Sequence, residues 1–223
     1  MDKIYRISNL SFSYEEEINV FSAVNIDLPS SEISVIVGKN GAGKTTLARI
    51  LTGLTKGYTG SILLDNIELS KQRRGTIIDQ VLYVKQDLIG NFMGITPDED
   101  LMIWQNRFIE EDNRKKKQDR ENALYQLGIT HLFNKPVWEL SYGQKRRSML
   151  SVSSLLANKF WILDEPTASL DEQGISLLMK LIAEKKETNS GMLILTHRPE
   201  LFNKLTNSVY FIRESQIIKN SQS

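Results

Sequence analysis

Cysteine is missing from all 223 residues of the chain. Disulfide bridges, thiolate metal sites and thiol nucleophiles are therefore excluded, and the absence fits a reducing compartment such as the cytosol. Long apolar runs are missing too, since no stretch approaches the roughly 18 residues that a membrane-spanning helix needs. The opening MDKIYRISN carries an acidic residue and no apolar signal-peptide region. We expect a chain that neither spans a membrane nor is exported, so any membrane association would depend on a protein partner.

Net charge is almost absent, because 28 Lys and Arg residues balance 27 Asp and Glu residues to leave +1. A chain so balanced has no positive field that would collect nucleic acid, and we expect no nucleic-acid partner. Hydrophobic residues make up 40% and charged residues 25%, which is ordinary for a soluble globular protein. The length allows one large or two small domains, and a single domain over residues 1–223 is the default.

Hydrophobic periodicity predicts an α/β organisation with a helical insertion. Alternating segments at 7–17 and 18–28 predict antiparallel strands, and 209–218 predicts a closing hairpin. Short β-branched or apolar runs predict further strands at 33–38, 61–69, 81–87, 160–165 and 192–197, and an amphipathic helix is expected at 174–186. Between about Asp87 and Ser154 the pattern becomes helical. The sequence therefore predicts an α/β core from 1–86 and 155–223, interrupted by a helical subdomain at 87–154.

A run of charge, NRKKKQDRE at 113–121, lies inside the predicted insertion. Such a run could bind phosphate or anionic lipid, or it could be the solvated face of a helix. Acidic residues flank and interrupt it, which favours the solvated face.

A glycine-rich turn follows the strand at 33–38. Residues Gly38 to Thr45 spell G-x-x-x-x-G-K-T, and the next segment has helical spacing at Leu47, Ile50, Leu51 and Leu54. Glycines let backbone N–H groups surround phosphates, the helix N-terminus adds partial positive charge, Lys44 reaches the β and γ phosphates, and the Thr45 hydroxyl ligates magnesium. A chance glycine-rich turn is the alternative, which the flanking strand and helix disfavour. The pattern predicts a nucleotide phosphate site.

An acidic pair closes the strand FWILDE, 120 residues after Lys44. A phosphate loop needs a carboxylate at the end of a neighbouring strand to hold magnesium through water, and Asp164 is placed for that role. Glu165 is then a candidate general base. In isolation such a pair could be a solvated strand end, so the inference depends on its pairing with the phosphate loop.

The segment LSYGQ at 140–144 resembles the signature motif LSGGQ of ABC ATPases. Nearly the whole chain is similar to that family in the order of its elements: Tyr14, the phosphate loop, Gln86, the signature, LDEPTASLD and His197. The resemblance implies a phosphate-loop NTPase (RecA-like) α/β fold. An N-terminal antiparallel β subdomain and a helical insertion that carries the signature would complete it. It further implies an ATPase that uses ATP and Mg²⁺.

The resemblance implies further residue roles. Tyr14 matches the aromatic that stacks on adenine, although a core strand aromatic is an equally good interpretation. Glu165, His197 and Gln86 match catalytic residues, and Thr45, Gln86 and Asp164 match the magnesium site. The remaining nucleotide-binding residues are expected to be Gly38, Lys39, Asn40, Gly41, Ala42, Gly43, Lys44, Thr45 and Thr46.

The signature implies a dimer. Ser141, Gly143 and Gln144 match residues that touch the γ-phosphate of ATP bound by an opposite subunit, and Asp171 matches the aspartate that bridges the two. A head-to-tail homodimer or heterodimer with a second ABC ATPase is therefore expected. The serine could equally serve as a helix cap. Tyr142 departs from the glycine of the consensus, either altering the dimer interface or facing a permissive spot, and we favour the latter.

The stretch VKQDLIGNFMGITPDEDL, with SFSY and GSILLDN, resembles ATPases of energy-coupling-factor and cobalt-type importers. Members of that subgroup usually continue into a further C-terminal segment. Four apolar residues would line a groove for a helix of the membrane partner or pack within the insertion: Leu88, Ile89, Phe92 and Met93.

The resemblance implies integral membrane transporter subunits as partners and a place at the cytoplasmic face of the cell membrane. Another importer or exporter, a soluble ABC ATPase and a phosphate-loop kinase are the alternatives. The signature disfavours a kinase, and the single cassette without long coiled coils disfavours soluble ABC proteins that act on DNA or ribosomes.

Overall fold

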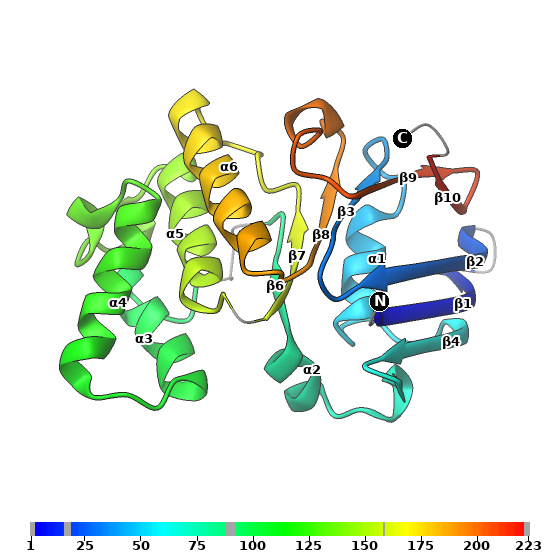
Figure 1. The fold of residues 1–223 in the computed structure, drawn as a ribbon, viewed down its shortest axis with the longest axis horizontal. Coiled ribbons are helices and arrows are strands. Elements are labelled where there is room, and N and C mark those ends of the chain that lie inside the picture. Colours follow the sequence, from blue (N-terminus) through cyan, green and yellow to red (C-terminus); the bar gives the residue numbers. More distant parts are fainter. Residues whose placement is uncertain (1–2, 16–18, 88–91, 158, 221–223) are drawn as a thin grey trace. The chain divides into compact units, whose positions relative to one another are not determined.

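The computed structural model describes residues 3–15, 19–87, 92–157 and 159–220 (Figure 1). The chain forms two compact units. The first comprises Met1–Tyr83, Lys159–Glu165 and Lys185–Ser223, and the second Val84–Asn158 and Pro166–Glu184. The single domain and the expected boundaries at 87 and 154 stay predictions.

An antiparallel sheet in the first unit is built from the early strands. β1 (Lys3–Ser13) pairs with β2 (Asn19–Pro29) on one side and with β4 (Thr59–Leu64) on the other, and β5 (Ile67–Glu68) follows β4. One apolar side of the alternating strands is buried, including Tyr5, Ile7 and Leu10. The predicted antiparallel pair at 7–28 is confirmed.

A six-stranded sheet positions the predicted phosphate site. Its order is β10-β9-β3-β8-β7-β6, and β3 (Ile33–Val37) lies between β8 (Met192–Thr196) and β9 (Ser208–Arg213), parallel to both. β7 (Phe160–Asp164) is parallel to β8, β10 (Gln216–Lys219) closes the predicted hairpin with β9, and β6 (Val81–Val84) is the other edge.

The register brings the carboxyl ends of three central strands to one edge of this sheet. Val37 is opposite Thr196, and Asp164 is opposite Leu195. All residues of β7 and β8 are buried, as their continuous apolar sequences predict. Ligands of parallel sheets bind at such carboxyl ends, so the loops after β3, β7 and β8 are the place to look for a site.

Helix α1 (Lys44–Leu51) follows the glycine-rich turn and covers the sheet through Leu47, Ile50 and Leu51, each of them fully buried. The helix is shorter than its apolar spacing predicts. Thr52 donates its hydroxyl to Ala48 O, and Gly53 has a φ of +67°, a backbone conformation that ends the helix before Leu54. The short helix α2 (Arg74–Gln80) was not predicted, since Ile77 is its only buried residue.

The second unit is helical. Its helices are α3 (Pro97–Phe108), α4 (Asn113–Gln126), α5 (Tyr142–Leu155) and most of α6 (Glu172–Glu187). Leu101, Leu124 and Leu150 are fully buried within it. Among the described residues, none of the helices has the length and apolarity to cross a membrane. Leu88 and Ile89 of the expected partner groove lie outside the described residues, while Met93 is exposed.

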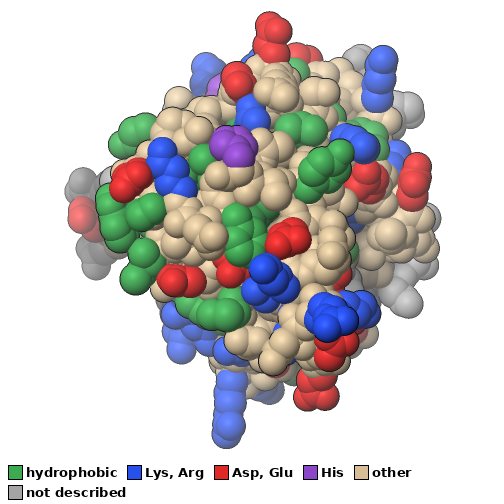
Figure 2. Space-filling view, turned by 90° about the vertical axis from the view of Figure 1, so that its left-hand side faces the viewer, with side chains coloured by type: hydrophobic (Ala, Val, Ile, Leu, Met, Phe, Trp, Pro, Cys, Tyr) green, Lys and Arg blue, Asp and Glu red, His purple; other side chains and the backbone are tan. Residues whose placement is uncertain are grey.

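Apart from the buried Arg120, which pairs with Asp98, the charge run lies on the solvent-facing side of α4. Lys115 and Lys117 pair with Glu111 and Glu121, each four residues away. Figure 2 shows the face on the left-hand side of Figure 1, where charged and hydrophobic side chains are interspersed. The predicted solvated helix face is confirmed.

A buried lysine sits where α6 re-enters the first unit. Lys185 is 3% exposed, donates to Lys159 O at 2.7 Å, and holds its ammonium 4.4 Å from the ring centroid of Trp161. Burial lowers the pKa of Lys185 from its ordinary value of 10.5 to about 7. Folding therefore disfavours the protonated form, and this cost is full below about pH 7 and disappears as the pH rises towards 10.5.

We expect Lys185→Met to stabilise the protein at pH 6 by ~1–3 kcal/mol, with the lost hydrogen bond and ring contact limiting the gain. The gain should shrink steadily towards pH 10. Urea unfolding of both proteins across this pH range measures it, and a difference in stability that stays constant with pH would contradict the argument.

Candidate functional site

The phosphate loop lies between β3 and α1, as predicted. Gly38 N donates to Thr196 O at 3.2 Å, which fixes the start of the loop to the neighbouring strand. Gly43 precedes the helix with a φ of +102°, and a Cβ there would lie 2.7 Å from Val20 Cγ1. Both the backbone angle and the packing against β2 therefore require glycine at this position.

Lys44 points back into this loop. Its ammonium donates to Gly38 O at 2.7 Å and Lys39 O at 3.1 Å, and it lies 3.0 Å from Glu165 Oε1. The side chains of Lys44 and Glu165 are only 6% and 3% exposed. The cation is thus held at the centre of the loop, where phosphate oxygens would meet it.

Asp164 receives hydrogen bonds on one oxygen only. Thr45 Oγ1 donates to Asp164 Oδ2 at 2.8 Å and Tyr83 Oη donates to the same atom at 3.1 Å. Oδ1 is buried without a hydrogen-bond partner among the described residues. Burial raises the pKa of Asp164, although the hydrogen bonds from Thr45 and Tyr83 oppose the shift. Tyr83 was not singled out from the sequence.

These donors fit magnesium. A hydroxyl and a buried carboxylate with an unpartnered oxygen are the hard oxygen ligands that Mg²⁺ prefers, and a nearby divalent cation would favour the ionised form of Asp164. No group of three or more His, Cys, Asp or Glu side chains that could hold a metal occurs in the part of the chain that the structure describes. The donor set therefore suits an ion that takes most of its remaining ligands from phosphates and water.

Glu165 directly follows β7 with a φ of +47°, a strained angle for a residue with a side chain. Its amide donates to Leu195 O at 2.9 Å, which anchors the turn to β8. Oε2 lies 2.9 Å from His197 Nδ1 and accepts a longer bond, 3.4 Å, from Thr196 Oγ1. A buried carboxylate is thus held between Lys44 and a half-exposed histidine.

Tyr14 lies beyond the end of β1 and is 55% exposed. Its hydroxyl is hydrogen-bonded to Thr46 Oγ1 at 3.0 Å, and its ring stands edge-on to Phe12 with centroids 5.0 Å apart. The alternative of a core strand aromatic is therefore wrong. The ring stays available for stacking beside the phosphate loop.

The signature segment begins α5 in the second unit. Ser141 caps the helix by accepting from Gln144 N at 3.3 Å, while the Gln144 side chain accepts from Ser141 N at 3.0 Å. A Cβ at Gly143 would lie 2.9 Å from Ser169 O, so this position also needs glycine. Tyr142, the departure from the consensus, is 65% exposed.

Asp171 and Gln86 belong to the second unit as well. Asp171 Oδ1 accepts from Gly174 N at 2.8 Å and is paired with Arg147, and these two interactions lower the pKa of the carboxyl. Gln86 is exposed, and its backbone carbonyl accepts from Arg146. The two arginines were not predicted as site residues.

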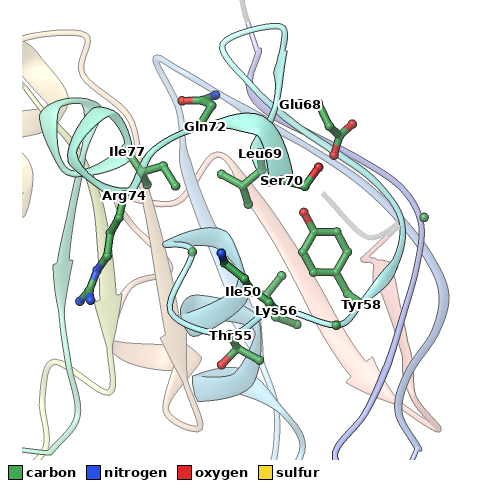
Figure 3. A pocket seen from close by; sticks show the side chains of 13 residues that line it. Ile50, Thr55, Lys56, Tyr58, Glu68, Leu69, Ser70, Gln72, Arg74 and Ile77 are labelled. Atoms are coloured by element: carbon green, nitrogen blue, oxygen red, sulfur yellow. The ribbon is translucent and has the colours of Figure 1, made fainter.

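The first unit therefore brings together Tyr14, residues 38–46, Asp164, Glu165 and His197, whereas Gln86, the signature residues and Asp171 are held in the second. A separate pocket of about 310 Å³ also lies in the first unit, between the end of α1 and the segment from β4 to α2 (Figure 3). Tyr58, Leu69 and Ile77 are among its walls, and it is lined by none of the predicted site residues.

A family described as ABC transporter matches residues 21–168, which include the phosphate loop, the signature and the acidic pair. The chain belongs to the ABC transporter ATPase family. This ABC ATPase is 33% identical to "Energy-coupling factor transporter ATP-binding protein EcfA2" of Clostridium perfringens, over 97% of its own length and 77% of the relative's. It is 30% identical to "Cobalt import ATP-binding protein CbiO" of Salmonella typhi, covering 95% of itself and 78% of that protein.

Solved structures agree with the fold of this ABC ATPase. CbiO1 of Clostridium perfringens, described as part of the ABC transporter complex cbiONQ, superposes with a TM-score of 0.81 at 29% identity. That match covers 98% of this chain and 88% of the other. The predicted α/β phosphate-loop fold, the ATPase class and the resemblance to energy-coupling-factor and cobalt-type ATPases are confirmed.

Proposed function

We propose that this ABC ATPase drives a membrane importer of the energy-coupling-factor or cobalt type, from the cytoplasmic face of the membrane and through integral membrane subunits. The observation that carries the catalytic part is the cluster of Lys44, Glu165 and His197 at the end of the sheet, beside Thr45 and Asp164. The relatives named above support the transport part. No nucleic-acid partner is proposed.

ATP would bind with its adenine against Tyr14 and its phosphates in the loop of residues 38–46. Lys44 then exchanges part of its bonding to Gly38 O, Lys39 O and Glu165 for the β and γ phosphates. Thr45 and Asp164 would hold Mg²⁺ together with Gln86, and the ion neutralises developing phosphate charge when bound. Glu165, released from Lys44, orients the attacking water and accepts its proton, while His197 keeps the carboxylate directed at the site.

The second half of each nucleotide site would come from another subunit. Ser141, Gly143 and Gln144 start a helix, where backbone N–H groups and partial positive charge suit a γ-phosphate. Asp171, with a largely exposed carboxylate, would bridge to the opposite subunit. This arrangement supports a head-to-tail dimer with a second copy or a related ATPase.

Two alternatives remain: another ABC importer or exporter, and a soluble ABC ATPase. Co-expression with the membrane proteins encoded beside it should recover the chain in a detergent-solubilised complex, and a chain that stays entirely free would favour the soluble alternative. In the absence of nucleotide, the isolated chain should be a monomer. When ATP is added, it should hydrolyse ATP slowly, at a specific rate that rises with protein concentration. A fast rate independent of concentration in a proven monomer would contradict the shared site.

A further inference from the structure

One arginine in the second unit is buried to an unusual degree. Arg146, on the first turns of α5, is 1% exposed. Its Nη1 donates to Lys85 O at 2.6 Å, its Nη2 to Gln86 O at 3.2 Å and its Nε to Ala168 O at 3.4 Å. Three backbone carbonyls from two distant segments are therefore gathered by one guanidinium.

We propose that Arg146 is a positioning residue that holds the backbone of Gln86 and the segment before Asp171 to the helix of the signature motif. The proposal rests on the proposed function, in which Gln86 and Asp171 act on the nucleotide. The three hydrogen bonds described above run from Arg146 to backbone carbonyls, so we expect its effect on hydrolysis to pass through the residues it holds.

The chemistry of the side chain suits this task. A guanidinium presents its donors in a rigid plane, so that neighbouring carbonyls are fixed in direction as well as in distance. Burying such a cation is costly unless its donors are satisfied, which makes the surrounding carbonyls a specific requirement. A lysine at 146 would offer one flexible ammonium and could not hold both segments in one geometry.

The next residue completes the link. Arg147 pairs with Asp171, and its side chain is 11% exposed. A Cβ at Gly174 would lie 3.0 Å from Arg147 Nε, so the small residue leaves room for the guanidinium. Two consecutive side chains of α5 thus hold both ends of the segment 168–171.

A consequence follows for catalysis. Ser141 caps the helix that carries Arg146, and Arg146 is bonded to the Gln86 backbone. We therefore expect the signature residues and the Gln86 backbone to move together. Contact of the signature with a γ-phosphate would then place Gln86 at the same time. Removal of Arg146 should therefore lower kcat while leaving the affinity of the phosphate loop for ATP nearly unchanged.

The test compares Arg146→Met and the milder Arg146→Lys with Arg120→Met. Arg120 is a matched control, because it is a buried arginine of the same unit, 8% exposed, that pairs with Asp98 and donates to Gln105 at 2.8 Å. ATP affinity, kcat and amide hydrogen exchange at residues 85–87 and 168–170 are measured for each, alone and combined with Gln86→Ala.

We expect Arg146→Met to lower kcat on the order of tenfold to a hundredfold, as small misplacements of catalytic groups do, and to speed exchange in both segments. Arg146→Lys should lie between it and the wild type. In the Gln86→Ala background Arg146→Met should have little further effect on kcat, because both changes remove one function. Arg120→Met should leave exchange at 85–87 and kcat near wild-type values.

Unchanged exchange in Arg146→Met, or effects on kcat that multiply in the double variant, would overturn the proposal. If Gln86→Ala alone hydrolyses ATP at the wild-type rate, the proposed catalytic role of Gln86 fails. The positioning role of Arg146 is then tested by amide hydrogen exchange at residues 85–87 alone. Failure of the catalytic role of Gln86 and failure of the positioning role of Arg146 can therefore be distinguished. If Arg146→Met does not fold, the same comparison is decided by Arg146→Lys.

Discussion

Glu165→Gln is expected to slow ATP hydrolysis by about a hundredfold or more, while ATP and magnesium still bind. Glutamine keeps the shape of the side chain and removes the carboxylate that would accept a proton from water. The proposed phosphate and magnesium ligands, Lys44, Thr45 and Asp164, are unchanged in this variant. Steady-state hydrolysis and calorimetric ATP affinity measured on the same preparation separate the two effects.

Slow hydrolysis should also make the dimer visible. Bound ATP persists in Glu165→Gln, so the shared sites stay closed, and size-exclusion chromatography should show a dimer with ATP and a monomer with ADP. Any related ATPase encoded beside this chain belongs in the experiment, because it could be the partner. Glu121→Gln, a change on the exposed side of α4, is the matched control. Wild-type hydrolysis by Glu165→Gln would remove Glu165 from the catalytic mechanism.

Lys44→Ala is expected to abolish tight ATP binding, since it removes the cation at the centre of the phosphate loop. The sequence alone predicts that the fold stays intact, because the lysine supplies charge to the phosphates rather than core contacts. The structure adds a cost: Lys44 and Glu165 form a buried pair, and loss of one partner from such a pair destabilises a protein by about 3–5 kcal/mol. Unfolding in urea should show this loss.

A double variant separates stability from binding. Lys44→Ala combined with Glu165→Gln removes both charges, so part of the stability lost in Lys44→Ala should return. ATP binding should not return with it. Calorimetry on the folded double variant therefore tests the role of Lys44 free of any unfolding, and recovered affinity would show that the lysine is not required for phosphate binding.

The parts of the site that sequence predicted are those whose geometry is local. The phosphate loop, the acidic pair after β7 and the histidine after β8 are each fixed by the element they follow, so adjacency in the chain becomes adjacency in space. Strand registers that align three carboxyl ends then bring them together. Ser141 was recognised both as a cap and as a signature residue, and the capping role is confirmed.

The interactions that sequence did not predict join distant segments. Tyr83 and Asp164 are 81 residues apart, and Arg146 and Lys85 are 61 apart, so no local pattern marks either contact. Tyr83 lies among the apolar residues of β6, so the sequence pattern indicates a strand residue and gives no sign of a contact with Asp164. Arg146 stands in a run of charged residues that suggests an exposed surface, and only the fold shows that it is buried.

The central position of β3 in the sheet has a consequence for when the phosphate loop can fold during synthesis. Within the described part of the chain, this strand, which ends at the phosphate loop, has β8 and β9 as its neighbours in the sheet, and Ser34 pairs with Leu193 and Ser208. During synthesis, β3 can pair with these strands only after more than 150 further residues have been added, because its partners are that distant in the sequence. A nascent chain that ends before β8 carries the complete phosphate-loop sequence but lacks the two strands that pair with β3. We therefore expect nucleotide to protect nascent chains from proteolysis only when they are long enough for β9 to have emerged.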